Sequence, residues 1–355
     1  MPIPTEPIGS IPRPTALIDA VRGYAEGVVS DAELARVQEE AIRNTIGRFE
    51  ETGSPVITDG EQTKSSFVTY PLDRLAALAP DGVVIPFADG HARQLPRLTA
   101  GPFRYAKHAA TFTEQALRYA TRPVKQAVIA ASAISLVYPQ DGIGDYPREA
   151  FLADLVDEAE ADIRGALEAG AHNVQIDFTE GRLALKLDPS KGLLRQFVEL
   201  NNEVLARFSD EERRRIGVHT CPGGDQDATH SAEVDYAELL PDLFRLNVGS
   251  VYMQLASEPD PERVLRIVRG VARPGQQVFV GVIDPINPRV ETPEEVRDRV
   301  IQAAQILERD HFGTCDDCGF SPFGDDVSTA RDTAFEKVRA RVEGTALAAE
   351  KLGIQ

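Results

Sequence analysis

Three residues, His219, Cys221 and Cys318, have the types and spacing of a metal site. His219 and Cys221 stand two apart at the end of the apolar segment 216–218, and alternate residues of an extended strand point to the same side. Their imidazole and thiolate can bind one metal ion, and Cys318 can supply a third ligand. Two sulfurs and one imidazole suit zinc, and three protein ligands leave one position for a substrate. We therefore predict a catalytic zinc site.

Other interpretations of these residues remain open at this stage. His219 can be a buried histidine that bonds to the backbone, and Cys221 can be a small apolar core residue. Cys315 and Cys318 form a Cys-x-x-Cys, which is also typical of a redox pair or half of a structural zinc knuckle. The chain has no second Cys-x-x-Cys to complete a knuckle. His172 and His230 are expected at the surface or beside the ligands.

Short apolar, β-branched segments alternate along the chain with longer amphipathic segments, as in parallel sheets covered by helices. We expect strands at residues 7–10, 56–61, 124–131, 173–178, 216–221, 248–254, 277–284 and 312–316. We expect helices near residues 31–52, 114–121, 148–170, 190–209, 233–245, 260–271, 293–308 and 328–348. Eight of each predict a (β/α)8 TIM barrel, an α/β fold, formed as a single domain by residues 1–355. The alternative is a doubly wound open sheet, but the first strand is not followed by a glycine-rich phosphate motif.

Two segments are longer than a minimal barrel needs. Residues 85–105 contain Asp89-Gly90, a typical turn between two extended arms, which predicts a hairpin inserted after the second strand. Residues 138–147 are rich in glycine and proline and predict a mobile loop near the active site.

Polar residues stand where the predicted strands end, and a barrel of this kind collects its chemistry at the carboxyl ends of its strands. These residues are Ser10, Asp59-Gly60-Glu61, Asp177, His219, Cys221, Gln254, Asp284 and, just past the last strand, Cys318. Their convergence from separate strands favours an enzyme. Asp177 and Glu61 can instead cap loops or pair with arginine.

The composition restricts the kinds of partner that the protein can bind. A chain of 355 residues with a formal charge of −18 lacks the basic surface that nucleic acid or an anionic membrane requires. We expect small-molecule partners, and a homo-oligomer is compatible with the sequence. Three cysteines cannot form a disulfide framework in a chain of this length, and no run of about 18 apolar residues occurs. We predict a cytoplasmic protein.

The pattern resembles the catalytic barrel of cobalamin-independent methionine synthases. His219-x-Cys221 and Asp316-Asp317-Cys318 resemble that family's zinc motif, and the order of shorter matches along the chain agrees. These matches are Ile8-Gly9-Ser10, Gly60-Glu61, Ile176-Asp177 and Gly281-Val282-Ile283-Asp284. The resemblance implies that His219, Cys221 and Cys318 hold zinc. It also implies that Ser10, Glu61 and Asp177 hold a thiol substrate.

Four positions depart from the family pattern. The chain has no tryptophan to pack on folate, and Leu136-Val137-Tyr138 stands in that region. Ile286 stands where the family has the histidine that protonates the departing folate. Gln254 replaces the family's glutamate ligand of zinc, unless the register shifts toward Glu258. The family's Asp-Glu-Pro-Ala is replaced by Asp177-Phe178-Thr179-Glu180.

These departures predict a zinc-dependent S-alkyltransferase that joins a small thiol to an alkyl donor other than methyltetrahydrofolate. The chain is also similar to epoxyalkane:coenzyme M transferases, and epoxide opening by coenzyme M is the leading hypothesis. A homocysteine S-methyltransferase is the alternative, and a thiol- or metal-binding barrel without turnover is the third. Candidate proton donors are Tyr138, His230 and a water held by Asp284. Candidate partners of a sulfonate are Arg13, Lys64 and Arg182.

Overall fold

The computed structural model describes residues 3–354 and contains a curved sheet of six parallel strands. The sheet order is β12-β11-β10-β7-β6-β5, with all neighbours parallel. The strands are β5 (Lys125–Ile129), β6 (Asn173–Asp177), β7 (Ile216–Thr220), β10 (Ser250–Met253), β11 (Gln277–Ile283) and β12 (Phe312–Asp316). Nearly every strand residue is buried, because helices cover the outside and side chains fill the inside.

Two irregular segments close the sheet into a (β/α)8 barrel. Thr5 forms a single parallel bridge with Thr314 of β12, and Ile57 forms one with Val124 beside β5. The two segments meet where the Ile11 amide donates to a carbonyl of the second segment, that of Gly60, at 3.0 Å. The barrel prediction is therefore confirmed, with its first two strands reduced to single bridges.

The predicted strand at 7–10 was wrong, since the bridge of this segment is at Thr5, and the predicted strand at 56–61 is reduced to the bridge at Ile57. In the first segment the prolines at positions 4, 7 and 12 have no amide hydrogen to donate to a ladder. In the second segment Gly60 and Glu61 have φ angles of 67° and 56°, which turn the chain out of the extended conformation. The third strand ends at Ile129 instead of 131, because α4 begins at Ala131.

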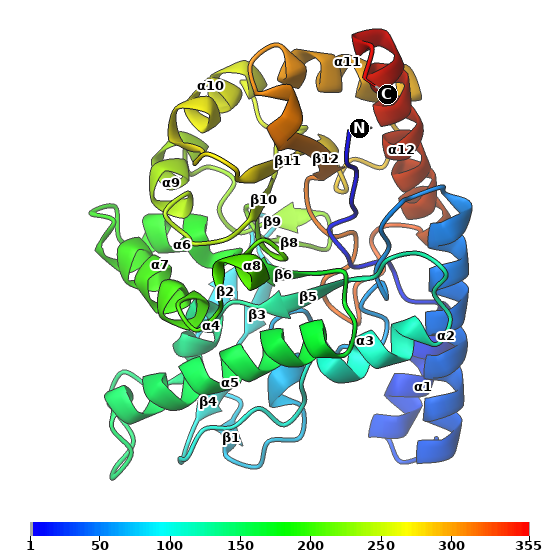
Figure 1. Ribbon diagram of the computed structural model, residues 1–355. Helices are drawn as coiled ribbons and strands as arrows, with labels where there is room; N and C mark the ends of the chain where they lie inside the picture. Colours follow the sequence, from blue (N-terminus) through cyan, green and yellow to red (C-terminus); the bar gives the residue numbers. More distant parts are fainter. Residues whose placement is uncertain (1–2, 355) are drawn as a thin grey trace.

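Helices surround the sheet in Figure 1. Each of the eight predicted helical regions overlaps a helix, although α3 begins four residues before its predicted start at 114: α2 (Asp31–Glu51), α3 (Ala110–Leu117), α5 (Arg148–Glu168), α7 (Gly192–Leu205), α9 (Tyr236–Leu243), α10 (Pro261–Val271), α11 (Pro293–Ala304) and α12 (Arg331–Leu352). The sequence analysis did not predict α1 (Thr15–Ala25), α4 (Ala131–Ile134), α6 (Glu180–Leu187), α8 (Asp210–Arg213) or the 3-10 turns Tyr70–Leu72, Ser135–Val137 and Arg309–His311. The predicted start of α11 is confirmed by a capping box between Thr292 and Glu295.

Small antiparallel pairs lie over the carboxyl end of the barrel. β2 (Val84–Pro86) pairs with β3 (Ala92–Gln94) across the Asp89-Gly90 turn, and β1 (Leu78–Ala79) pairs with β4 (Arg97–Leu98). After β7, β8 (Gly224–Asp225) pairs with β9 (Ala228–Thr229). Arg93 of β3 pairs with Asp225 and Asp325, so it joins the β2–β3 hairpin to the loops that follow β7 and β12.

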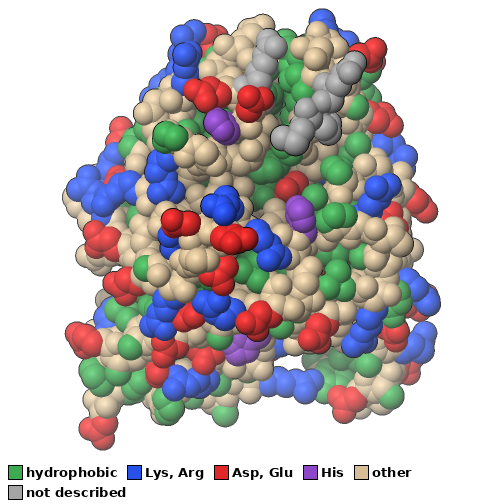
Figure 2. All heavy atoms as spheres, in the orientation of Figure 1, with side chains coloured by type: hydrophobic (Ala, Val, Ile, Leu, Met, Phe, Trp, Pro, Cys, Tyr) green, Lys and Arg blue, Asp and Glu red, His purple; other side chains and the backbone are tan. Residues whose placement is uncertain are grey.

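The surface agrees with the composition. On the face shown in Figure 2, acidic and basic side chains are interspersed, with no broad basic patch on that face. None of the helices within residues 3–354 combines the length and the apolar character that crossing a lipid bilayer requires.

A buried ion pair fastens α12 to the barrel. Arg341 is fully buried and donates to the carboxylate of Asp316, the last residue of β12, at 2.7 Å. The same carboxylate oxygen accepts from the amide of Ile8 at 3.3 Å, and Arg341 also donates to Ser54. This pair therefore connects the last helix, the last strand and both irregular closing segments.

We predict that Arg341→Met lowers the free energy of unfolding by about 3–5 kcal/mol, because it leaves the Asp316 carboxylate buried without its counter-charge. Urea denaturation measures the change. Arg339→Met is the matched control, since Arg339 is an exposed residue of the same helix, and a loss below about 1 kcal/mol is expected there. Equal losses in the two variants would contradict this account of the closure.

Candidate metal centre and adjoining pocket

The structure brings His219, Cys221 and Cys318 together. His219 lies in β7, Cys221 follows that strand directly, and Cys318 lies two residues past the end of β12. One ligand atom from each residue lies within 4.8 Å of the others, and the two sulfurs are 3.1 Å apart. His219 and Cys221 are buried, and Cys318 is partly exposed. The residues predicted from the spacing thus form one cluster.

The chemistry of this cluster fits a zinc ion. Both ring nitrogens of His219 are buried and have no hydrogen-bond partner, an arrangement that costs free energy unless a ligand satisfies them. Hydrogen bonding to Cys318 and the nearby imidazole hold the pKa of Cys221 well below its usual range, whereas the same pairing raises the pKa of Cys318. Two sulfurs that compete for one proton beside a free imidazole are a typical zinc donor set.

Asp317 holds the last ligand in position. Its carboxylate accepts the amides of Leu255, Ala256 and Ser257, each at 2.8 Å, and the Ser257 hydroxyl at 2.6 Å. The loop after β12 is therefore fixed to the loop after β10. A side chain at Gly281 would collide with Asp317, since an added Cβ would lie 1.8 Å from its Oδ1. The sequence analysis did not identify Asp317 as a site residue, because nothing in its spacing indicates these backbone partners.

The side chain of Gln254, the predicted fourth ligand, is paired with an acidic neighbour. The amide nitrogen of Gln254 donates to Glu258 at 3.0 Å, and Arg182 pairs with the same carboxylate. Among the histidine, cysteine and acidic residues within 3–354, the metal cluster at β7 contains His219, Cys221 and Cys318 and does not contain Glu258. Gln254 as a ligand stays a prediction.

A small cavity adjoins the cluster and contains the predicted thiol-binding residues. Ser10, Glu61 and Asp177 line it together with His219 and Cys318. The Oε2 atom of Glu61 is buried without a partner. Burial raises the pKa of Asp177 to about 7, although Gln175 donates to its carboxylate at 2.8 Å. Two buried carboxyl groups therefore face the space beside the metal ligands.

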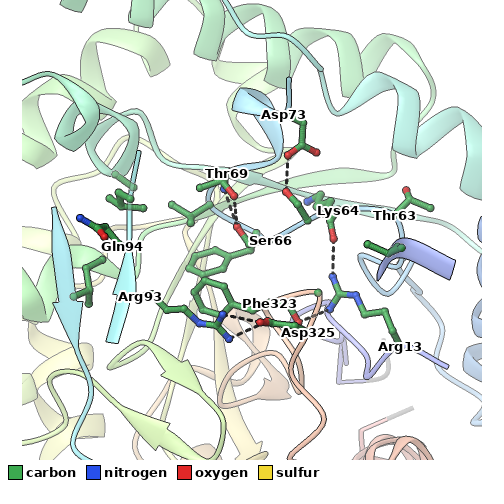
Figure 3. A pocket seen from close by; sticks show the side chains of 18 of the residues that line it. Arg13, Thr63, Lys64, Ser66, Thr69, Asp73, Arg93, Gln94, Phe323 and Asp325 are labelled. Atoms are coloured by element: carbon green, nitrogen blue, oxygen red, sulfur yellow. Dashed lines mark hydrogen bonds and ion pairs between the residues drawn. The ribbon is translucent and has the colours of Figure 1, made fainter. Parts of the chain in front are cut away.

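The three cations predicted to bind a sulfonate have internal partners. Arg13 donates to the carbonyls of Glu61 at 2.6 Å and of Lys64 at 3.1 Å, as Figure 3 shows for Lys64. Lys64 donates to the carbonyl of Ala127 at 2.8 Å and pairs with Glu61 at 3.4 Å. Arg182 is paired with Glu258. These side chains fix the loops around the site.

A larger pocket of about 570 Å³ opens next to the small cavity, and Phe67, Thr179, Gly223 and Gly224 line both. Phe67 and Phe323 pack edge to face in its wall with ring centroids 5.7 Å apart, and the Arg93 guanidinium lies 4.3 Å from the centroid of Phe323 (Figure 3). Leu136 also lines this pocket, and it belongs to the region where the resemblance placed a tryptophan. The larger pocket and the small cavity therefore share part of their walls.

Of the predicted proton donors, the structure brings only His230 to the pocket. Burial lowers the pKa of His230 to about 4, so its ring is neutral near pH 7, and its Nδ1 lies 2.8 Å from the Ser231 hydroxyl. Tyr138 lines neither cavity, because its hydroxyl donates to the carbonyl of Tyr146 at 2.7 Å in the segment 138–147.

Asp284 also lines neither cavity. Its carboxylate accepts the amide of Ile286 at 3.0 Å and so closes a local turn after β11. Glu180 lines the large pocket instead, although the sequence analysis did not select it. The only signal in the sequence was its place in a motif that departs from the family pattern.

Comparisons with known proteins agree with this architecture. Residues 3–342 match the family model described as "Cobalamin-independent synthase, Catalytic domain". The chain is 25% identical to a methionine synthase of Sulfurisphaera tokodaii, over 99% of this chain and 94% of that protein. It is 23% identical to a methionine synthase of Saccharolobus islandicus, over 99% and 96% of the two chains.

Two solved structures share the fold. A B12-independent methionine synthase from Shewanella sp. W3-18-1, in complex with selenomethionine, superposes with a TM-score of 0.76 at 19% identity and full coverage of both chains. A putative vitamin-B12 independent methionine synthase from Listeria monocytogenes gives 0.71 at 20% identity and 97% coverage of each. The protein belongs to the family of cobalamin-independent methionine synthase catalytic domains, and it is a transferase of that family.

Proposed function

We propose that this protein is a zinc-dependent S-methyltransferase that converts homocysteine to methionine. One observation carries the proposal: a single small cavity joins the metal ligands to two buried carboxyl groups, those of Glu61 and Asp177. A thiol that binds through its sulfur at the metal ligands therefore places its other end among acidic groups. An α-ammonium group is the complement of that end.

The same cavity disfavours a thiol that ends in a sulfonate. Within residues 3–354, no lysine or arginine lines the small cavity. Arg13, Lys64 and Arg182 lie nearby, but their donors are used by carbonyls and by internal carboxylates. A sulfonate would lie beside the carboxyl groups of Glu61 and Asp177 with no cation lining the cavity within residues 3–354 to pair with it, whereas the ammonium group of an amino acid would complement those carboxyl groups. Coenzyme M is therefore the poorer substrate for this site.

His219, Cys221 and Cys318 would hold the zinc ion. When bound, zinc supplies the chemistry that keeps a thiol deprotonated and nucleophilic near pH 7. Ser10, Glu61 and Asp177 orient the amino-acid end, and burial of the cavity excludes water from the sulfur. The methyl donor occupies the larger pocket. Phe67 lines both this pocket and the small cavity that holds the thiol.

The leading hypothesis from the sequence, epoxide opening by coenzyme M, has less support than the methyltransferase. The curated relatives described above are named methionine synthases, and the charges of the small cavity favour an amino acid. The epoxide reaction remains a prediction that the same assay tests.

We predict that Cys221→Ala and Cys318→Ala each lose the zinc ion, about one per chain, because each removes one of three protein ligands. Metal analysis of the purified protein measures the content. Cys315→Ala is the matched control, since Cys315 is buried, contacts the Phe279 carbonyl and lies outside the cluster. Retained zinc in both ligand variants would remove the proposed site, and loss in the control would indicate a structural role for the Cys-x-x-Cys.

We predict that Glu61→Gln raises the KM for homocysteine about 10- to 100-fold, because a charged hydrogen bond to the substrate ammonium is lost. The matched substrate is 4-mercaptobutyrate, which lacks the amino group, and its KM should change little. The KM values for both thiols are measured by mass spectrometry of the S-methylated product, with iodomethane as a simple methyl donor. A parallel assay measures the product of coenzyme M and epoxypropane. Preferred turnover of coenzyme M, or equal effects on both thiols, would contradict the assignment of homocysteine.

A further inference from the structure

Glu180 is a buried acid that the mechanism above does not use. It is the first residue of α6, is 4% exposed, and lines the larger pocket. The residue before it, Thr179, lines both the pocket and the small cavity. Glu180 therefore lines the larger pocket next in sequence to a residue that the two spaces share.

A chain of hydrogen bonds fixes the orientation of this carboxyl group. The Asn201 amide nitrogen donates to the Ser132 hydroxyl oxygen at 2.6 Å, and the Ser132 hydroxyl donates to Oε1 of Glu180. Asn201 cannot turn over freely, because its Oδ1 accepts the Ala131 amide at 3.1 Å and its nitrogen also donates to the Phe197 carbonyl at 2.9 Å. Since Oε1 accepts, the proton of a neutral Glu180 resides on Oε2.

The surroundings keep Glu180 protonated. Oε2 is buried and has no hydrogen-bond partner. The pKa of Glu180 is raised to about 8, mainly by burial and to a smaller extent by the nearby carboxylate of Asp177, while the bond from Ser132 opposes the shift. His230, which also lines this pocket, is neutral near pH 7 because burial lowers its pKa to about 4. A protonated carboxyl group thus faces the pocket across the neutral pH range.

We propose that Glu180 is the catalytic acid that protonates the departing nitrogen of an N-methyl donor bound in the larger pocket. The inference rests on the proposed methyltransferase function. As the sulfur–carbon bond forms, the carbon–nitrogen bond breaks and its electron pair goes to nitrogen. The proton moves from Oε2 to that nitrogen, Glu180 becomes a carboxylate, and a solvent proton restores it before the next turnover.

This role limits the class of methyl donor. An amine leaving group departs as an anion unless it is protonated, so an acid in the pocket lowers its barrier. A sulfonium donor leaves as a neutral thioether and gains nothing from an acid. Glu180 stands where the family pattern has alanine, and Ile286 stands where that pattern has its histidine acid. Glu180 therefore supplies an acid from a different strand end.

Glu180→Gln tests the proposal through its dependence on the leaving group. With homocysteine and 5-methyltetrahydrofolate, kcat should fall about 100-fold or more, since general acids contribute at least that factor. With homocysteine and iodomethane, whose iodide needs no proton, the rate should stay at the wild-type value. The wild-type rate with 5-methyltetrahydrofolate should also fall as the pH rises through about 8, and the variant should lose this dependence.

Glu203→Gln, at an exposed position of α7, is the control and should leave both rates unchanged. Zinc content and circular dichroism verify that each variant is folded. Equal losses with both electrophiles, or no loss with 5-methyltetrahydrofolate, would overturn the acid role. Turnover by the wild type of S-methylmethionine but not 5-methyltetrahydrofolate, or of iodomethane alone, would overturn the N-methyl assignment. Failure of the wild type to alkylate homocysteine even with iodomethane would instead overturn the proposed function.

Discussion

The site depends on keeping the ends of β7 and β12 in register, although 97 residues separate Cys221 from Cys318. The parallel ladder through β10 and β11 sets the heights of these two ends. The Asp317 carboxylate then fixes the last loop by accepting three backbone amides and one hydroxyl. Four bonds to one anionic group offset much of the cost of burying it, and they determine where the next side chain, Cys318, points.

The charged side chains near the cluster have two roles: the basic ones stabilise loops, and the acidic ones are available to a ligand. Basic side chains such as Arg13 and Lys64 are turned toward backbone carbonyls, where they stabilise loops that have no regular secondary structure. Acidic side chains such as Glu61 keep an unpaired oxygen toward the small cavity. An unpaired buried oxygen costs free energy in the free protein, and the ammonium group of the proposed substrate would satisfy it.

The sequence predicted those features that follow from local periodicity and from residue spacing. Alternation along β7 placed His219 and Cys221 on one side, and the order of buried runs predicted the barrel. It did not predict the bridges at Thr5 and Ile57, because prolines and left-handed residues interrupt strands without changing the apolar pattern. Tyr138 and Asp284 were misplaced for a related reason, since proximity to a strand end does not show whether a side chain turns into the cavity or bonds to its own loop.

The large pocket shows why a missing residue is weak evidence for a missing function. The absence of tryptophan predicted that the chain lacks an aromatic surface for a flat methyl donor. Phe67 and Phe323 come from different parts of the chain and pack edge to face in the pocket wall, with Arg93 against the second ring. Glu180 likewise places a protonated acid where the sequence pattern indicated no donor. Tertiary contacts assemble both the aromatic pair and the acid. A substitution at one family position therefore does not show whether a residue at another strand end takes over the lost role.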